Sequence, residues 1–150
     1  MRDYTKIKAF VKADDLVMRV YQLTRSWPSE EMYGLTSQVR RAAVSVASNI
    51  VEGSGRRHLP DYLQFVNRAY TSLREVGYDL HLAHRLGYVN DGSYTEISGM
   101  QDEASRVLWG LMETLAAQLG QSLTEYIVRE EGAAYETNAG DTDQHVCPGL

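Results

Sequence analysis

The stretch at residues 34–53 reads GLTSQVRRAAVSVASNIVEG. Its apolar residues recur three or four positions apart, and residues at that spacing lie on one face of an α-helix. A glycine stands at each end, and glycine directly after the last helical turn is a common terminator. We therefore predict a helix over residues 35–52 with one buried apolar stripe: Leu35, Val39, Ala42, Val46 and Ile50.

The same helix carries a second, polar stripe. It is composed of amides, hydroxyls, one arginine and one glutamate, whereas a solvated face is usually rich in lysine and glutamate. A helix with two such faces needs a partner on each side, which is a neighbouring helix or a second subunit. We predict that Glu75 pairs with Arg41, because a buried charge must be paired. The alternative is a partly solvated face with no fixed partner. The polar stripe consists of Gln38, Arg41, Ser45, Asn49 (or Ser48) and Glu52.

Three further helices are predicted by apolar periodicity, over about residues 12–25, 59–86 and 93–121. The third of the four helices has an unbroken heptad pattern, which favours near-parallel packing of neighbouring helices. Four amphipathic helices joined by short loops bury their faces most simply as an all-α, antiparallel up-down-up-down four-helix bundle. We expect this bundle to occupy residues 1–121. The extension at 122–150 is poor in large apolar residues beyond Gly132, so we expect it to be largely disordered.

The composition is that of an ordinary globular protein, with 43% hydrophobic and 23% charged residues and a net charge of −5. The negative charge belongs to the extension, since residues 122–150 hold six acids and one base while the remainder is neutral. No apolar run is long enough to span a membrane. The single cysteine, Cys147, excludes an internal disulfide and fits a reducing compartment, so we expect a cytoplasmic protein.

Basic residues gather near the N-terminus and around the loop that precedes the predicted third helix. Backbone amides of the loop at residues 53–57, a helix N-terminus and two arginines could hold a phosphate group. The alternative is a glycine cap followed by a solvated turn. The candidate anion or nucleic-acid contacts are Lys6, Lys8, Lys12, Arg40, Arg56 and Arg57.

Catalytic and metal-binding signatures are missing from the sequence. His81 and His84 share a helical face, but the repeated Glu-x-x-His pairs of di-iron bundles are absent. Hydrolase elbows, Cys-x-x-Cys pairs and zinc-protease motifs are absent as well. We therefore expect no enzymatic activity, no cofactor, no metal and no small-molecule substrate, with the two histidines at a rim or an interface.

Several motifs in order resemble a bacterial family first recognised in open reading frames within 23S rRNA intervening sequences. The resemblance covers roughly residues 4–120. It departs from the family pattern at Thr71, where the family usually has glycine, and residues beyond about 122 lie outside it. The motifs are Tyr33–Leu35, Gln38–Ala43, Ser45, Asn49–Gly53, Tyr62–Phe65, Ala69, Ser72–Glu75 and Leu86–Tyr88.

The resemblance implies an antiparallel four-helix bundle that assembles into a ring, commonly a homopentamer, without established enzymatic activity. It also implies a suggested role in binding RNA or nucleoprotein, as in a distant class of retroelement accessory proteins that form basic pentamers. The neutral body and acidic extension of this chain depart from that class. We therefore expect a self-assembling, non-enzymatic scaffold or adaptor. The alternative is an RNA-binding module acting through the basic residues at the N-terminus and at Arg56–Arg57.

Overall fold

The computed structural model of this protein describes the backbone of residues 2–139 and the side chains of residues 2–133. Across these residues the chain is all-helical and has no β-strand, as the sequence predicts. Cys147 and the predicted disorder of residues 140–150 lie outside the described part. The α-helices are α1 (Lys8–Thr24), α2 (Leu35–Ser54), α3 (Leu59–Arg85), α4 (Asp91–Gln118) and α5 (Leu123–Ala139), with short 3-10 turns at Tyr4–Lys6 and Ser29–Glu31.

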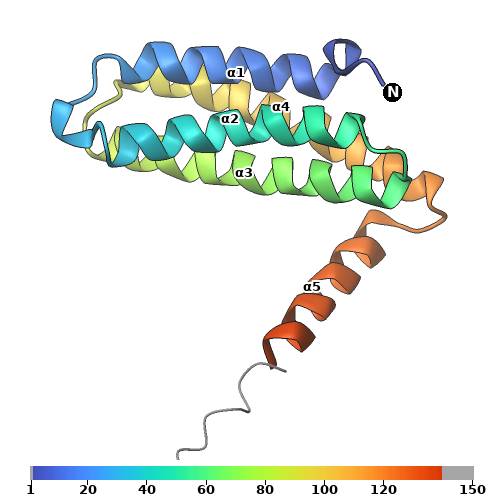
Figure 1. The fold of residues 1–150 in the computed structure, drawn as a ribbon. Helices are drawn as coiled ribbons and strands as arrows, with labels where there is room; N and C mark the ends of the chain where they lie inside the picture. The colour runs from blue at the N-terminus through green and yellow to red at the C-terminus, as the bar shows by residue number, and fades with distance from the viewer. Residues whose placement is uncertain (1, 140–150) are drawn as a thin grey trace, which may run out of the picture.

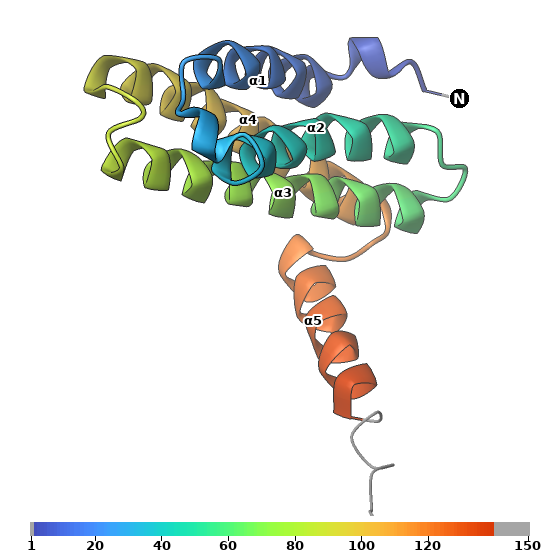
Figure 2. The same ribbon diagram turned by 60° about the vertical axis from the view of Figure 1, so that its left-hand side comes forward.

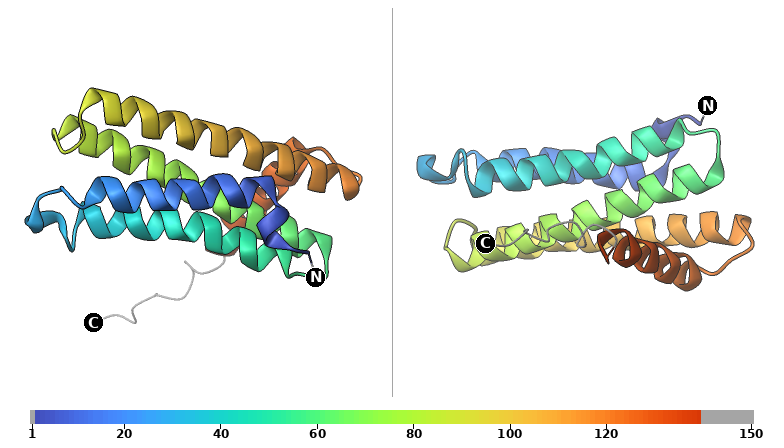
Figure 3. Two further views of the ribbon diagram at one scale, coloured as in Figure 1. Left: turned by 90° about the horizontal axis from the view of Figure 1, so that it is seen from above. Right: turned by 60° about the horizontal axis from the view of Figure 1, so that its bottom comes forward.

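Helices α1 to α4 lie side by side, and short connections return the chain along the preceding helix (Figure 1). α1 packs on α2 and α4, and α3 packs on the same two helices. Figure 3 shows this arrangement from above and from below, with α1 and α2 forming one pair and α3 and α4 the other. Each helix therefore has two neighbours and one side left facing outward.

The predicted apolar stripe of α2 forms part of the core. Its members are at most 7% exposed. The heptad stripe of α3 is buried from Tyr62 to Ala83, and only its first member, Leu59, is half-buried. Burial of these stripes removes apolar surface from water, which is the main force that holds helices of this kind together.

Two helices begin earlier than the periodicity predicts. α1 starts at Lys8 rather than residue 12, since Ala9 and Ala13 extend its buried stripe by a turn. α4 starts at Asp91 rather than residue 93, because the side chain of Asn90 accepts a 2.8 Å hydrogen bond from the Ser93 amide. Such a bond satisfies a free amide of the first turn and fixes the helix start.

The glycine at position 53 has a different role from the predicted one. α2 continues to Ser54, and positive φ angles occur among the described residues only at Gly87 and Gly120. A Cβ atom on Gly53 would lie 2.9 Å from side-chain carbons of both Tyr62 and Phe65. Gly53 is therefore needed for the close approach of α2 to α3 rather than for a helix cap.

The expectation of disorder over residues 122–150 is wrong for residues 123–139, which form α5. Ser122 and Glu125 cap this helix reciprocally, since the Glu125 carboxylate accepts from the Ser122 amide and the Ser122 hydroxyl accepts from the Glu125 amide. Leu123 and Tyr126 are buried and anchor its first turn. The remainder of α5 points away from the other four helices (Figures 1 and 2).

Candidate functional site

The polar stripe of α2 lies largely against α3. Gln38 donates a 2.9 Å hydrogen bond from Nε2 to Oδ1 of Asp79, and the hydroxyls of Ser45 and Ser72 are 2.9 Å apart. Asn49 donates to the carbonyl and the hydroxyl of Ser45, one turn earlier on the same helix. The structure thus places this part of the polar stripe at the α2–α3 contact within one chain.

Asp79 is a buried carboxyl group that the sequence analysis missed. It lies between Val76 and Leu80, two positions of the α3 heptad. Its exposed fraction is 0%, and its Oδ2 atom is buried without a hydrogen-bond partner. Burial and, to a smaller extent, the negative charge of Glu75 together raise the pKa of Asp79 to about 6, against the opposing effect of the hydrogen bond from Gln38. The available signal was an acidic residue directly before Leu80, a buried position of the α3 heptad.

The predicted ion pair between Arg41 and Glu75 does not form within the described residues of the chain. Both side chains are exposed, so neither charge requires a fixed partner. Glu52 also leaves the α3 contact and forms an ion pair with Arg56, four residues later. The charged members of the polar stripe therefore face outward, while its neutral members face α3.

The six predicted basic contacts do not form one surface. Lys6 pairs with Asp3 at 3.6 Å, and Lys12 pairs with Glu103 on α4 at 2.9 Å. Lys8 is exposed without an ion pair among the described residues.

Arg40 is held against α1. It donates a 2.8 Å hydrogen bond to the Thr24 hydroxyl and lies over the Tyr21 ring. Arg40 and Arg56 are 16 residues apart along α2 and its C-terminal end, which corresponds to about 24 Å. Arg40 therefore cannot act together with the loop arginines on one small ligand.

An arginine cluster does form at the α2–α3 connection, where Arg56 and Arg57 are joined by Arg2, which the sequence analysis did not select. These three residues and Gly55 line a cavity of about 670 Å³. Arg2 Nη1 donates a 3.0 Å hydrogen bond to the Arg56 carbonyl, and its guanidinium lies 4.7 Å from the centre of the Tyr62 ring. Only folding brings residue 2 to residue 56.

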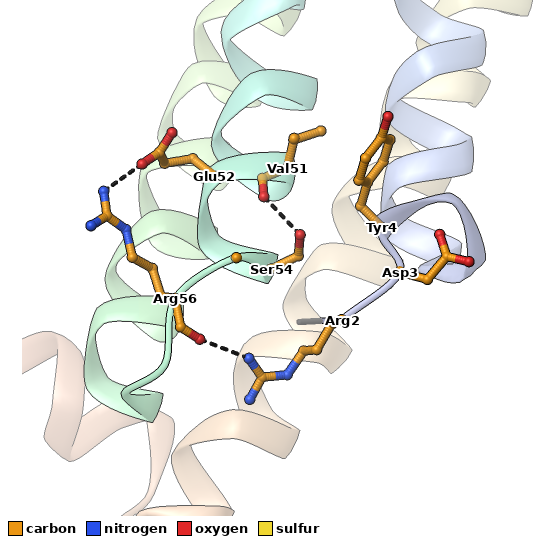
Figure 4. Close-up of a pocket in the computed structure, with 8 residues that line it drawn as sticks. Arg2, Asp3, Tyr4, Val51, Glu52, Ser54 and Arg56 are labelled. Carbon is orange, nitrogen blue, oxygen red and sulfur yellow. Dashed lines mark hydrogen bonds and ion pairs between the residues drawn. The ribbon is translucent and has the colours of Figure 1, made fainter.

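A close-up of the neighbouring pocket shows two members of the cluster, Arg2 and Arg56, with the contact of Arg2 to the Arg56 carbonyl and that of Arg56 to Glu52 (Figure 4). The Arg56 side chain is bound to Glu52 and also lies over the Phe65 ring, at 4.6 Å from its centre. Arg57 is exposed and has no ion pair among the described residues. The cluster therefore contains one fully available guanidinium and two that are oriented by other contacts.

An apolar groove runs between α1 and α2 on the outer side of the molecule. Four small or branched apolar side chains line it, and Asp14, Ser48 and Glu52 are polar residues on its edge. Its volume is about 410 Å³. We refer to this surface as the α1/α2 groove, with the apolar members Val17, Val44, Ala47 and Val51.

His81 and His84 lie near the α3–α4 connection. His84 Nε2 is 2.7 Å from Asp91 Oδ1 and its ring stacks on Tyr94, while His81 is exposed. Within the described residues, no three metal-ligating side chains come together. None of the described helices is long and apolar enough to cross a membrane.

Comparisons with known proteins give one family and one fold. The 23S rRNA-intervening sequence protein family matches residues 5–110, which run from the first 3-10 turn into α4. A crystal structure of a protein of unknown function from the S23 ribosomal protein family of Bacteroides thetaiotaomicron VPI-5482 is similar in fold, with a TM-score of 0.64 and 20% sequence identity. The similarity covers 70% of this chain and 98% of that chain. No curated protein matches this sequence. The chain belongs to the 23S rRNA-intervening sequence protein family.

Proposed function

We propose that this protein is a non-enzymatic scaffold or adaptor in the cytoplasm, an antiparallel up-down-up-down four-helix bundle that assembles with copies of itself. The α1/α2 groove is the observation that carries the proposal. A groove with an apolar lining, bordered by exposed apolar residues, is a candidate contact surface for another molecule. The homopentamer is the form that the family resemblance favours.

The exposed apolar residues next to the groove extend this surface. Val44 is 40% exposed within the groove. On α1, Val11 and Met18 are 43% and 57% exposed, and they are spaced seven residues apart on one helical face with Asp14 between them. A stripe of this width on two adjacent helices can receive a helix or helix pair of a second subunit.

A ring follows if the groove binds a different surface of the next copy, because head-to-tail contacts close when the rotation between copies is a simple fraction of a turn. The neutral members of the polar stripe are used within the chain, so they do not supply the contact between copies. The polar stripe was one predicted surface for contact with a second subunit, so another surface is needed for that contact. The apolar outer side of α2 is the surface that lacks a partner within the chain.

Light scattering with absorbance recorded at 260 nm tests the proposal. We expect a molar mass that is a multiple of the 16.9 kDa chain. Val44→Glu should shift the mass toward one chain, because it places a charge within the apolar contact. Leu86→Glu, at the α3–α4 turn and 50% exposed, is the control and should leave the mass unchanged. A wild-type protein that runs as a single chain at high concentration would overturn the proposal.

The arginine cluster favours a second candidate function, the binding of RNA or another nucleic acid. Guanidinium groups supported by aromatic rings are suited to phosphates and bases. If this function holds, Arg56→Ala with Arg57→Ala weakens retention of a single-stranded RNA, and raising the salt concentration weakens it for the wild type. Arg25→Ala with Arg85→Ala removes the same charge at the other end of the helices and should have little effect. Equal RNA retention by the two double variants would exclude the cluster.

A further inference from the structure

Helix α5 is attached to the rest of the chain by its N-terminal half, in which Arg129 and Glu130 line a pocket together with Pro60. Leu123 and Tyr126 are buried and Ile127 is half-buried, whereas all described side chains from Val128 to Ala133 are exposed. The helix packs on α4. Its residue Tyr126 also lies near Pro60, at the start of α3. Figure 2 shows the outer turns of α5 standing clear of the other helices.

A helix in this position needs a partner. Isolated helices shorter than about 12–15 residues are marginally stable in water, and helices in proteins are held mostly by tertiary packing. The described side chains at positions 128–132 are all exposed in one chain. Val128 is 63% exposed and offers an apolar contact on this outer part.

The charges of α5 and of the arginine cluster are complementary. Glu130 and Glu131 are exposed and form no ion pair among the described residues, while Glu125 is used in the helix cap. In the cluster, Arg57 has no ion pair and Arg2 uses a single guanidinium nitrogen for the Arg56 carbonyl. The described outer part of α5 therefore carries two available carboxylates and one base, Arg129, against a cavity lined by three guanidinium groups.

We propose that the acidic outer part of α5, with Glu130 and Glu131, docks on the arginine cluster of a second copy of this chain. The contact joins carboxylates to Arg57 and Arg2, and Val128 adds apolar burial. Arginine pairs with carboxylates through two parallel hydrogen bonds, so the cluster can orient the helix as well as attract it.

The partner is taken to be a second copy because, among the described residues, no ion pair joins Glu130 or Glu131 to the arginine cluster of the same chain. The packing of α5 is confined to α4 and the start of α3, and its outer turns point away from the four packed helices. α5 also lies beyond residues 5–110, the part matched by the family. This inference rests on the proposed self-assembly and names one of its contacts.

Charge reversal on each side tests the contact with full-length protein. One variant carries Glu130→Arg with Glu131→Arg, and the other carries Arg56→Glu with Arg57→Glu. We expect each variant to need an about tenfold higher concentration for assembly in light scattering, since like charges then face one another. Glu30→Arg with Asp102→Arg is the control, because it reverses two exposed acids elsewhere and should assemble like the wild type.

The decisive sample is an equimolar mixture of the two variants. The reversed α5 of one variant then meets the reversed arginine cluster of the other, and the unaltered α5 meets the unaltered cluster. Assembly should therefore return toward the concentration that the wild type needs. An intramolecular contact cannot be rescued by mixing. Arg57→Glu alone serves as a second cluster variant, because Arg57 has no contact with Glu52 and its loss should not disturb the fold, which circular dichroism checks.

The outcomes separate this inference from the proposed function. If the wild type assembles and the Glu130→Arg, Glu131→Arg variant assembles at the same concentration, the proposed docking of α5 is wrong and self-assembly stands. If both variants are weakened and the mixture stays dissociated, the contact is not between α5 and the cluster of another copy. If the wild type itself is a single chain, the proposed function fails first.

Discussion

Replacing Asp79 by asparagine should make the protein more stable at neutral pH and less sensitive to pH. The carboxyl group is fully buried at the α2–α3 contact, with a hydrogen bond from Gln38 to one oxygen and none to the other. Burial of a carboxylate with one hydrogen bond and no cation disfavours the charged form. Asparagine resembles the protonated acid in shape and keeps an oxygen to accept the Gln38 bond.

The pKa shift sets the size of the effect. The pKa of Asp79 rises from 3.8 to about 6 on folding, so the folded state holds its proton more tightly than the unfolded state. The contribution is present below the unfolded pKa and is lost as pH rises through about 6. A shift of about two pH units corresponds to about 3 kcal/mol at 1.36 kcal/mol per unit. We therefore expect the stability gain of Asp79→Asn to grow by about 2–3 kcal/mol between pH 4 and pH 7.5.

Urea unfolding of both proteins across that pH range measures the difference. Comparing two proteins cancels the opposite effect of Glu96, Glu103 and Glu125, whose pKa values are lowered by Arg19, by Lys12 and by the Ser122 cap respectively. Asp102→Asn removes one exposed acid from α4 and is the control for net charge.

Glu75→Gln gives an independent check on the same residue. The charge of Glu75 contributes to the raised pKa of Asp79, so its removal should move the midpoint of the pH effect downward. The reasoning is refuted if the stability difference between Asp79→Asn and the wild type is the same at pH 4 and pH 7.5. A loss of stability at pH 7.5 in the asparagine variant would refute it equally.

Three further predictions concern the packing and the helix ends. Gly53→Ala should lower the free energy of unfolding by about 1–3 kcal/mol, since the new methyl group meets two aromatic side chains of α3. Gly110→Ala has free space and should raise the free energy of unfolding by about 0.4–1 kcal/mol. Thermal unfolding of both variants checks this, and equal melting temperatures would contradict it. Asn90→Ala should cost about 1 kcal/mol by removing the cap of α4, with helix content measured by circular dichroism, and Asn90→Ser should recover most of it. Arg19→Ala should lower the free energy of unfolding by only about 0.2–1 kcal/mol, because the two hydrogen bonds of Arg19 to Glu96 lie at the surface. This loss should disappear in about 1 M salt. A larger, salt-independent loss would show that the aliphatic part of Arg19 matters more than its charge.

Much of the fold follows from local patterns. The stripe of Leu35, Val39 and Ile50 and the heptad of α3 depend only on the 3.6-residue period of a helix, so one sequence suffices to recognise them. The boundaries were less accurate, because a helix start depends on which side chain reaches the free amides. α4 begins before the predicted residue 93, because Asn90 caps it.

The candidate sites were predicted less well, since they depend on contacts between distant residues. Arg2 joins Arg56 across 54 positions, and no pattern in either segment indicates the other. The Arg41–Glu75 prediction assumed that charged members of the polar stripe are buried, but they lie at its exposed edge. α5 was missed because the extension is poor in large apolar residues beyond Gly132, whereas the helix depends on an anchor that comes earlier, the buried Leu123 and Tyr126.

The sequence by itself therefore determined the helical class, the four buried stripes and the family, because each is written in the spacing of neighbouring residues. Only the tertiary structure decided that Gly53 serves close packing, that Asp79 is buried beside Gln38, that an arginine cluster forms at the α2–α3 connection, and that an apolar groove lies between α1 and α2. The physical reason is that burial, pKa and the grouping of charges depend on which surfaces meet. That meeting is a property of the packed helices and not of any single segment.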